Sequence, residues 1–146
     1  GIGFESTLKM INSAMLAKGG EESLATLDVA CIDLFTGHVS LRKAGAAGTV
    51  LRRRKKTEYL EAKSVPVGIL PEIAFARSEK DLEAGDMLVM VSDGVTASGT
   101  EWLCDLIANY EDDDPQALSE RIVERAVKDR ADGHEDDVSA VVLLIE

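Results

Sequence analysis

Carboxylates mark the ends of two apolar segments that lie far apart in the sequence. Asp93 and Gly94 come shortly after the apolar run 87–91. The C-terminal apolar run has the reverse order, because Asp136 and Asp137 come before it. If both segments are strands that pair antiparallel, Asp93 and either Asp136 or Asp137 share one edge of the sheet. The sequence therefore predicts a carboxylate cluster built from two distant segments.

Clustered carboxylates without a histidine or cysteine ligand pattern suit a hard cation. Mg²⁺ and Mn²⁺ prefer oxygen ligands, and a few carboxylates are sufficient because such ions usually keep several waters. Gly94 has no side chain, so that other groups can approach its backbone closely, and its carbonyl could also face the metal. We therefore take Asp93, Asp136, Gly94 and Asp137 as candidate metal-site residues.

These acidic residues allow other interpretations. An EF-hand loop with Gly133 as its glycine would place Lys128 and Arg130 where acidic ligands are required. A carboxylate pair for glycoside hydrolysis lacks the aromatic side chains that sugars often use, since aromatics make up only 4% of the chain. The plainest alternative is that Ser-Asp-Gly is a common turn and Asp-Asp a common solvated strand start. The residues alone leave the turn and the ligand site nearly even.

The surrounding sequence predicts an α+β domain with antiparallel strands. Residues 4–20 have helical spacing, hairpin strands follow, and two more helices precede a final buried strand. The run 87–91 is apolar throughout, as expected of a central strand covered on both faces. Asp114 followed by Pro115 marks the start of the clearest helix. Strand runs beside helices favour α+β over alternating βαβ architecture.

Helical periodicity defines the faces that the helices should bury. Leu8, Ile11 and Met15 share one face of the first helix. The two later helices are predicted to bury Trp102, Leu103, Leu106 and Ile107, and Leu118, Ile122, Val123, Ala126 and Val127.

Composition and charge limit the location and the partners. The 146 residues are enough for one domain with a real core. The net charge of −11 argues against a nucleic-acid partner, because binding needs Lys and Arg to neutralise phosphates. Cys31 and Cys104 lie in apolar segments without metal-type spacing, so we predict buried free thiols and a reducing, cytoplasmic location.

The basic cluster at Arg52–Lys56 is the exception to this acidic character. The interpretation that we favour is a solvated hairpin tip. The alternative is a docking patch for an acidic partner or an anionic membrane, and five charges in one loop do not decide between them.

At the acidic strand ends the chain resembles metal-dependent protein serine/threonine phosphatases of the protein phosphatase 2C type. The segment "LEAGDMLVMVSDGVTAS" is similar to the family's strand followed by "SDG". Four more segments, in the family's order, resemble its bacterial branch typified by stage II sporulation protein E. They are "ATLDVACIDLFTG", "LRKAGAAGTVLRR", "VPVGIL" and "DGHEDDVSAVVLLIE". Each is weak alone, but together the five cover nearly the whole chain.

The resemblance implies an αββα sandwich, in which helices flank two antiparallel sheets. It also implies hydrolysis of phosphoserine or phosphothreonine by two Mn²⁺ or Mg²⁺ ions. On the motif, Asp93 matches the metal-ligand aspartate of "SDG", and Asp136 matches the aspartate that begins the last-strand motif. Asp137 matches the second position of that motif. The expected partner is a phosphorylated protein, with a homodimer left open.

Two departures from the family pattern matter. The family's N-terminal segment, with a metal-bridging aspartate in "DG.G", has no counterpart here, so we expect residues 1–146 to be the C-terminal part of one phosphatase domain. Such a fragment should be inactive alone, and any membrane anchor would belong to other parts of a longer chain. Gly48 stands where the branch usually has proline, which should loosen that segment.

In the sporulation branch, the substrate is a phosphoserine on a small anti-anti-sigma factor, which sets the expectation for this chain. The branch also has two regulatory helices, and residues 4–20 resemble the second of them. The sequence of this stretch alone indicates only an ordinary amphipathic packing helix. The alternative function is a catalytically dead relative that serves as a protein-interaction domain.

Overall fold

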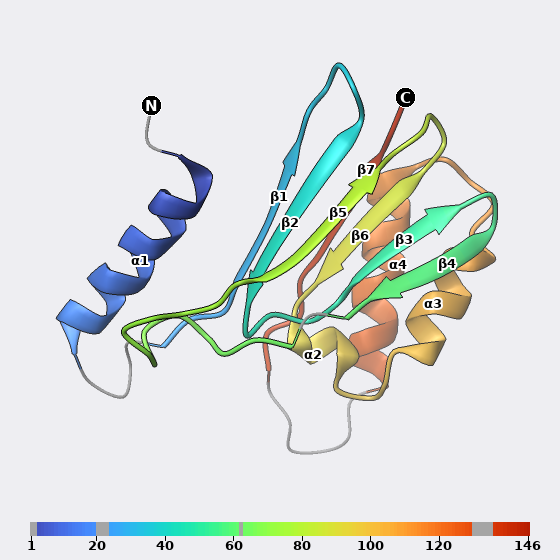
Figure 1. Cartoon of the computed structure of the whole chain (residues 1–146). Coiled ribbons are helices and arrows are strands. Elements are labelled where there is room, and N and C mark those ends of the chain that lie inside the picture. Colours follow the sequence, from blue (N-terminus) through green and yellow to red (C-terminus); the bar gives the residue numbers. More distant parts are fainter. Residues whose placement is uncertain (1–2, 20–23, 62, 130–135) are drawn as a thin grey trace. The chain divides into compact units, whose positions relative to one another are not determined.

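A computed structural model describes residues 3–19, 24–61, 63–129 and 136–146 of the chain. The chain has the α+β architecture predicted, with helices and antiparallel sheets (Figure 1). It divides into two compact units. The first comprises Gly1–Cys31, Ser40–Ala46 and Ala62–Glu79, and the second comprises Ile32–Val39, Ala47–Glu61 and Lys80–Glu146.

The first unit contains helix α1 and most of a three-stranded sheet. Helix α1 spans Phe4–Lys18, and the strands are β1 (Leu27–Ile32), β2 (His38–Ala44) and β5 (Ala76–Asp81), in the order β1-β2-β5. Strand β5 alternates between half-buried and exposed residues along its length.

The buried face of α1 differs from the prediction. Leu8 is buried as expected, but Ile11 is exposed and Met15 is only half-buried. Asn12 takes the buried position instead. Its amide donates to the carbonyl of Leu70 at 2.9 Å and its Oδ1 accepts from the Gly68 amide at 2.9 Å. A polar side chain can be buried here because both ends of its amide are hydrogen-bonded, and hydrophobic periodicity cannot reveal such a contact.

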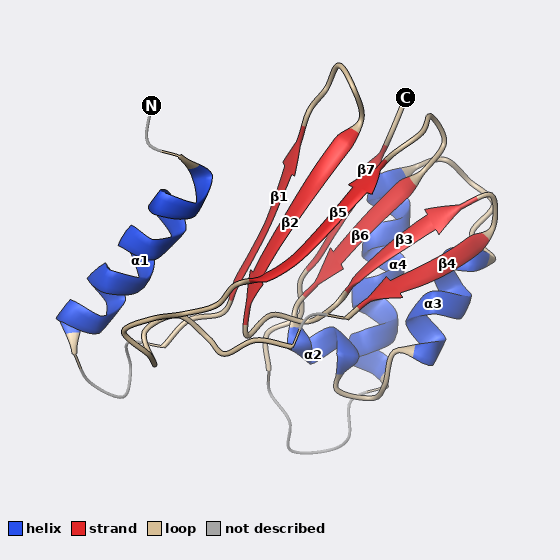
Figure 2. Cartoon of the chain, in the orientation of Figure 1, coloured by secondary structure: helices blue, strands red, loops and turns tan. Residues whose placement is uncertain are grey.

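The second unit is a four-stranded antiparallel sheet with helices on one face (Figure 2). Its strands are β3 (Thr49–Arg53), β4 (Lys56–Leu60), β6 (Met87–Val91) and β7 (Ala140–Leu144), in the order β4-β3-β6-β7. The helices are α2 (Asp93–Thr96), α3 (Glu101–Ala108) and α4 (Pro115–Lys128). Helix α3 packs on β3 and β4, and α4 packs on β7.

The core of this unit confirms most of the predicted faces. Strand β6 is central and almost completely buried. Asp114 caps α4, since its Oδ1 accepts from the amides of Gln116 and Ala117 at 2.9 and 3.2 Å. The core consists of Val50, Met87, Val89, Val91, Val95, Leu103, Ile107, Tyr110, Leu118, Ile122 and Ala126.

Three predictions of burial are wrong. Val127 is 49% exposed, because it lies beyond the edge of the buried face of α4. Strand β7 is only half-buried, with Val141 56% exposed, because β7 forms an edge of the sheet. Cys31 is exposed and Cys104 is half-buried, although both thiols are free as predicted.

The basic cluster Arg52–Lys56 covers the end of β3, the turn at Arg54 and Lys55, and the first residue of β4, and only part of it is solvated. Arg54 and Lys55 are exposed and adopt positive φ angles of 49° and 64°. Arg52 is buried and donates to the carbonyl of Tyr110 at 2.9 Å. Arg53 makes three hydrogen bonds of 2.6–3.1 Å to the Asp86 carboxylate. Two of the five basic residues therefore hold the unit together.

The Arg53–Asp86 pair should make stability depend on acid pH. Burial alone would raise the pKa of Asp86. The Arg53 hydrogen bonds, the Glu83 amide and the neighbouring arginine charges together outweigh burial, so that the pKa lies below its ordinary value. A carboxyl with a depressed pKa stabilises the fold above its unfolded pKa of about 3.9, and this stabilisation is lost as the pH falls through the lower folded value.

We expect Asp86→Asn to lower the free energy of unfolding at pH 7 by about 2 kcal/mol, in the range of hydrogen bonds to charged groups. The Arg53 side chain is 38% exposed, so water offsets part of the loss. The difference from the parent should shrink below about pH 4. Urea unfolding from pH 3 to 8 measures it, with exposed Asp105→Asn as control. A pH-independent difference would contradict the role of the Asp86 charge.

No helix within the described ranges is both long and apolar enough to cross a membrane.

Candidate metal centre

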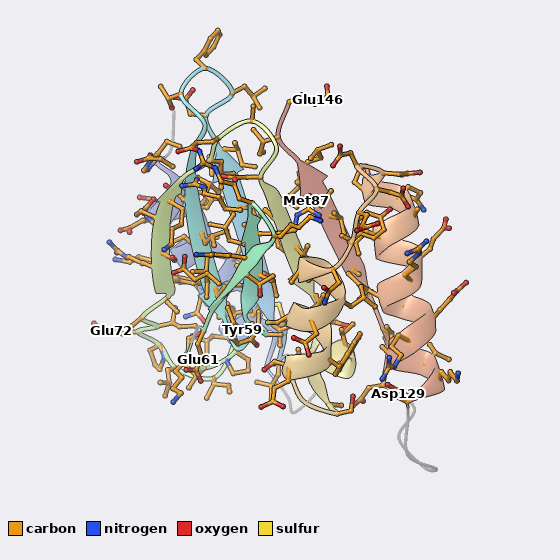
Figure 3. The ribbon with its side chains drawn as sticks, turned by 90° about the vertical axis from the view of Figure 1, so that its right-hand side faces the viewer. Tyr59, Glu61, Glu72, Met87, Asp129 and Glu146 are labelled. Atoms are coloured by element: carbon orange, nitrogen blue, oxygen red, sulfur yellow. The ribbon has the colours of Figure 1, made fainter. Side chains whose placement is uncertain are left out.

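Strands β6 and β7 bring the two acidic segments to the same end of the sheet. They pair antiparallel, as the sequence predicts, with Met87 opposite Leu144 and Val91 opposite Ala140. In Figure 3, Asp129 after α4 and Glu146 after β7 lie at opposite ends of the second unit. The end at which α4 finishes is therefore the end at which β7 begins, and there β6 runs into α2.

Asp93 is the first residue of α2, so the segment after β6 is a short helix and not a simple turn. Its side chain is exposed, and its Oδ1 accepts from the Gly94 amide at 3.1 Å. Its carbonyl accepts from the Thr96 hydroxyl at 3.1 Å. One carboxylate oxygen is thus oriented by the backbone, and the side chain faces water, as a hydrated cation requires.

Gly94 lies at a close approach of the two acidic segments. It is buried, and a β-carbon at this position would lie 2.5 Å from the carbonyl oxygen of Asp137 and 3.5 Å from the β-carbon of Asp136. Such a contact with a carbonyl is too short for any residue that has a side chain. The sequence prediction that Gly94 permits a close backbone approach is therefore confirmed.

Asp136 and Asp137 are the first described residues before β7, and both are exposed. The structure thus brings Asp136 and Asp137 against Gly94, the neighbour of Asp93. Residues 130–135, which include part of the predicted last-strand motif, lie outside the described residues. The role of the four positions as metal-site residues stays a prediction.

The donor set fits part of the shell of a hard cation. Exposed carboxylates at a sheet end offer oxygen ligands and leave room for water, which suits Mn²⁺ and Mg²⁺. Within the described parts of the chain, no group of three or more His, Cys, Asp or Glu side chains could hold an ion. A cation at this edge would take its other ligands from water or from residues beyond those described.

Ser92 is not among the predicted site residues, but it joins the two acidic segments directly. Its Oγ donates to the carbonyl of Asp137 at 3.1 Å and accepts from the Ser139 amide at 3.0 Å. Its own amide donates to the carbonyl of Ser139 at 3.0 Å. The only sequence signal was its place in "SDG", which does not reveal a contact with the other strand.

Gly48 precedes β3 and lies near the same end of the sheet, because Thr49 pairs with Met90. The expected loosening at Gly48 stays a prediction, but the structure gives this glycine a specific contact. Its amide donates to the Tyr59 hydroxyl at 3.0 Å, and the Tyr59 ring fills the space that a side chain at position 48 would need. Tyr59, labelled in Figure 3, comes from the neighbouring strand β4.

Two hollows of the second unit lie elsewhere, beside the basic β3–β4 turn. One has a volume of about 270 Å³ and is lined by Arg52–Lys55, by 83–86 and by Tyr110, Glu111 and Asp113. The other, of about 410 Å³, is lined by Leu51, Arg53, Arg54, 56–58, Lys80 and Asp81. Since Arg52 pairs with Met87, at the opposite end of β6 from Asp93, neither hollow belongs to the acidic edge.

Comparison with known families gives a match over the whole chain. The model of a family described as stage II sporulation protein E matches residues 1–146. Stage II sporulation protein E of Priestia megaterium is 30% identical over 152 residues, and the match covers 99% of the chain. The chain spans only 26% of that protein's length.

Solved structures show the same fold. The PP2C phosphatase domain with a fragment of the regulatory domain of the cell fate determinant SpoIIE from Bacillus subtilis matches with a TM-score of 0.86 and 28% identity. This match covers 100% of the chain and 46% of the solved one. An Mn-presoaked structure of the SpoIIE phosphatase domain matches with a TM-score of 0.75 and 26% identity, covering 100% and 68%. The similarity confirms the predicted fold class.

Proposed function

Because the chain belongs to the stage II sporulation protein E family, we propose that it forms part of a metal-dependent phosphatase that removes phosphate from phosphoserine or phosphothreonine on a protein. The observation that carries this proposal is the antiparallel pairing of β6 with β7. That pairing supports the proposal because it brings the two acidic segments to one end of the sheet, where a β-carbon on Gly94 would lie 2.5 Å from the Asp137 carbonyl oxygen.

Each residue of the acidic edge has a role in this proposal. Asp93 and Asp136 hold a divalent cation through their carboxylates, and Asp137 is a weaker candidate ligand. Gly94 keeps the two segments close enough to serve one site. When bound, Mn²⁺ or Mg²⁺ would lower the pKa of a water so that hydroxide is available to attack phosphorus, and would neutralise charge on the phosphoryl group.

The proposed substrate class is a phosphorylated protein, and a phosphoserine on an anti-anti-sigma factor is the first candidate. The resemblance to the sporulation branch supports this choice. The acidic character of the chain makes a nucleic-acid substrate a poor alternative.

We further propose that residues 1–146 are the C-terminal part of one phosphatase domain whose bridging aspartate lies outside them. The coverage of a solved relative supports this proposal. The chain spans 46% of the solved phosphatase structure that also holds part of a regulatory domain. We accordingly expect the chain alone to be inactive.

The alternative function is a phosphatase-like domain without catalysis that binds a protein. The full-length sequence distinguishes the two. A "DG.G" aspartate upstream of α1 supports an enzyme, and a full-length protein without such an aspartate supports an interaction domain.

Metal binding by the chain can be tested by thermal unfolding. A cation that binds only the folded state stabilises it by about 1.4 kcal/mol at ten times its Kd, which corresponds to a few degrees in Tm. We expect millimolar Mn²⁺ to raise the Tm of the parent and to have less effect on Asp93→Asn. Without metal, Asp93→Asn should be as stable as the parent or more stable, because a charge among carboxylates is removed.

Asp105→Asn is a matched control, because Asp105 is an exposed carboxylate on α3 away from the acidic edge. It should keep the full response to Mn²⁺. Equal responses in the parent and Asp93→Asn would show that the metal does not bind at Asp93.

A further inference from the structure

Ser92 is the residue at which β6 ends and α2 begins. The register of β6 and β7 places it opposite Ser139, one step beyond the pair Val91–Ala140. In a regular antiparallel ladder, two such residues exchange hydrogen bonds through both backbone amides and both carbonyls. Only half of this exchange is made by the backbone, because the Ser92 amide donates to the Ser139 carbonyl at 3.0 Å.

The Ser92 hydroxyl makes the other half. The Ser139 amide donates to Ser92 Oγ at 3.0 Å in place of the backbone carbonyl. The Ser92 carbonyl is thereby free to accept from the Val95 amide at 3.1 Å, which starts the first turn of α2. The hydroxyl thus lets the chain leave the strand immediately before Asp93 while β7 stays attached.

The same hydroxyl reaches the second acidic segment. Ser92 Oγ donates to the carbonyl of Asp137 at 3.1 Å, so its donor and one of its acceptor sites are both used. The carbonyl of Asp137 is also the atom that a β-carbon on Gly94 would meet. One side chain therefore fixes Asp137 next to Gly94 and fixes the start of the helix that carries Asp93.

We propose that Ser92 is a positioning residue for the metal centre, which sets the backbone of Asp93 against the backbone of Asp136 and Asp137. This inference rests on the proposed function, because it assumes that these carboxylates share a cation. Groups that orient metal ligands from outside the coordination shell typically change metal affinity by about 10- to 100-fold when they are removed.

The test is the Mn²⁺ affinity of the chain, measured from the electron paramagnetic resonance of free Mn²⁺ at a temperature where all variants are folded. We expect Ser92→Ala to bind Mn²⁺ about 10- to 100-fold more weakly than the parent. Ser92→Thr keeps the hydroxyl and should bind within about threefold of the parent. If Ser92→Ala does not fold, Ser92→Cys takes its place, and its weaker donor should give an intermediate affinity.

Ser119→Ala is the matched control, because the half-buried Ser119 hydroxyl likewise donates to a backbone carbonyl, that of Gln116 at 2.8 Å, but lies on α4. It should leave Mn²⁺ affinity unchanged. Amide exchange gives a second readout, since Ser92→Ala, or Ser92→Cys in its place, should speed exchange at Ser139 and Ser92→Thr should not.

The outcomes separate this inference from the proposed function. Parent-like affinity in Ser92→Ala, or in Ser92→Cys when that variant replaces it, overturns the role of Ser92, provided that Asp93→Asn binds more weakly. A Ser92→Thr variant that binds as poorly as Ser92→Ala overturns it as well. If Asp93→Asn binds Mn²⁺ as well as the parent does, the metal site itself is wrongly placed, and the inference about Ser92 fails with it.

Discussion

Asp93→Ala in the full-length protein is expected to slow Mn²⁺-dependent release of phosphate from a phosphoserine protein by more than about 100-fold. The loss should exceed the 10- to 100-fold effect that is typical of residues outside the coordination shell, because a ligand itself is removed. Asp136→Ala should cause a similar loss, since Asp136 stands at the start of the paired segment beside Gly94.

The control for this experiment is Asp105→Ala, which removes an exposed carboxylate from α3 and should leave the rate unchanged. The assay compares the variants side by side with the same phosphorylated protein, with Mn²⁺ and with EDTA. Activity that survives Asp93→Ala would show that the family's site has been assigned to the wrong residue.

Gly94→Ala is expected to lower both the stability of the fold and its response to Mn²⁺. The new β-carbon would lie 2.5 Å from the Asp137 carbonyl oxygen, so the backbone of one segment must move. Overpacking of this kind costs about 1–3 kcal/mol of stability. The movement also separates Asp93 from Asp136, so that the rise in Tm with Mn²⁺ should be lost.

Gly3→Ala is a matched control for the loss of a glycine. Gly3 has an ordinary φ of −66°, and a β-carbon there would meet nothing within 4 Å. Thermal unfolding with and without Mn²⁺ measures both variants. A Gly94→Ala protein that keeps the stability and the metal response of the parent would contradict the close approach of the two segments.

The sequence predicts the parts of the fold that depend on local patterns. The apolar run Met87–Val91 is strand β6 as expected, because a strand covered on both faces needs apolar residues throughout. The cap and proline at Asp114 and Pro115 correctly mark the start of α4. The antiparallel pairing of β6 and β7 is also predicted, because acidic residues follow the first strand and precede the second in the sequence.

The parts that the sequence does not predict depend on contacts between distant residues. Asn12 is buried because its amide is hydrogen-bonded to a loop more than fifty residues away. Arg52 and Arg53 look like solvated hairpin charges, but Tyr110 and Asp86 accept their hydrogen bonds. Each of these contacts satisfies a polar side chain away from water, and none of them follows from hydrophobic periodicity.

The candidate site shows the same division. The motifs identify Asp93 and Asp136 by residue type and order. Ser92, in contrast, is defined by its contacts with Asp137 and Ser139 across the sheet. A serine after a strand is common in turns, so that its part in joining the two segments becomes visible only when the strand register is known.

The most direct test of the metal centre is the anomalous scattering of Mn²⁺ in crystals of the full-length protein. A peak bonded to carboxylate oxygens of Asp93 and Asp136, at about 2.1 Å, is the predicted result. Mn²⁺ bound only elsewhere in the molecule, with both carboxylates free of metal at saturating Mn²⁺, would contradict the assignment of the site.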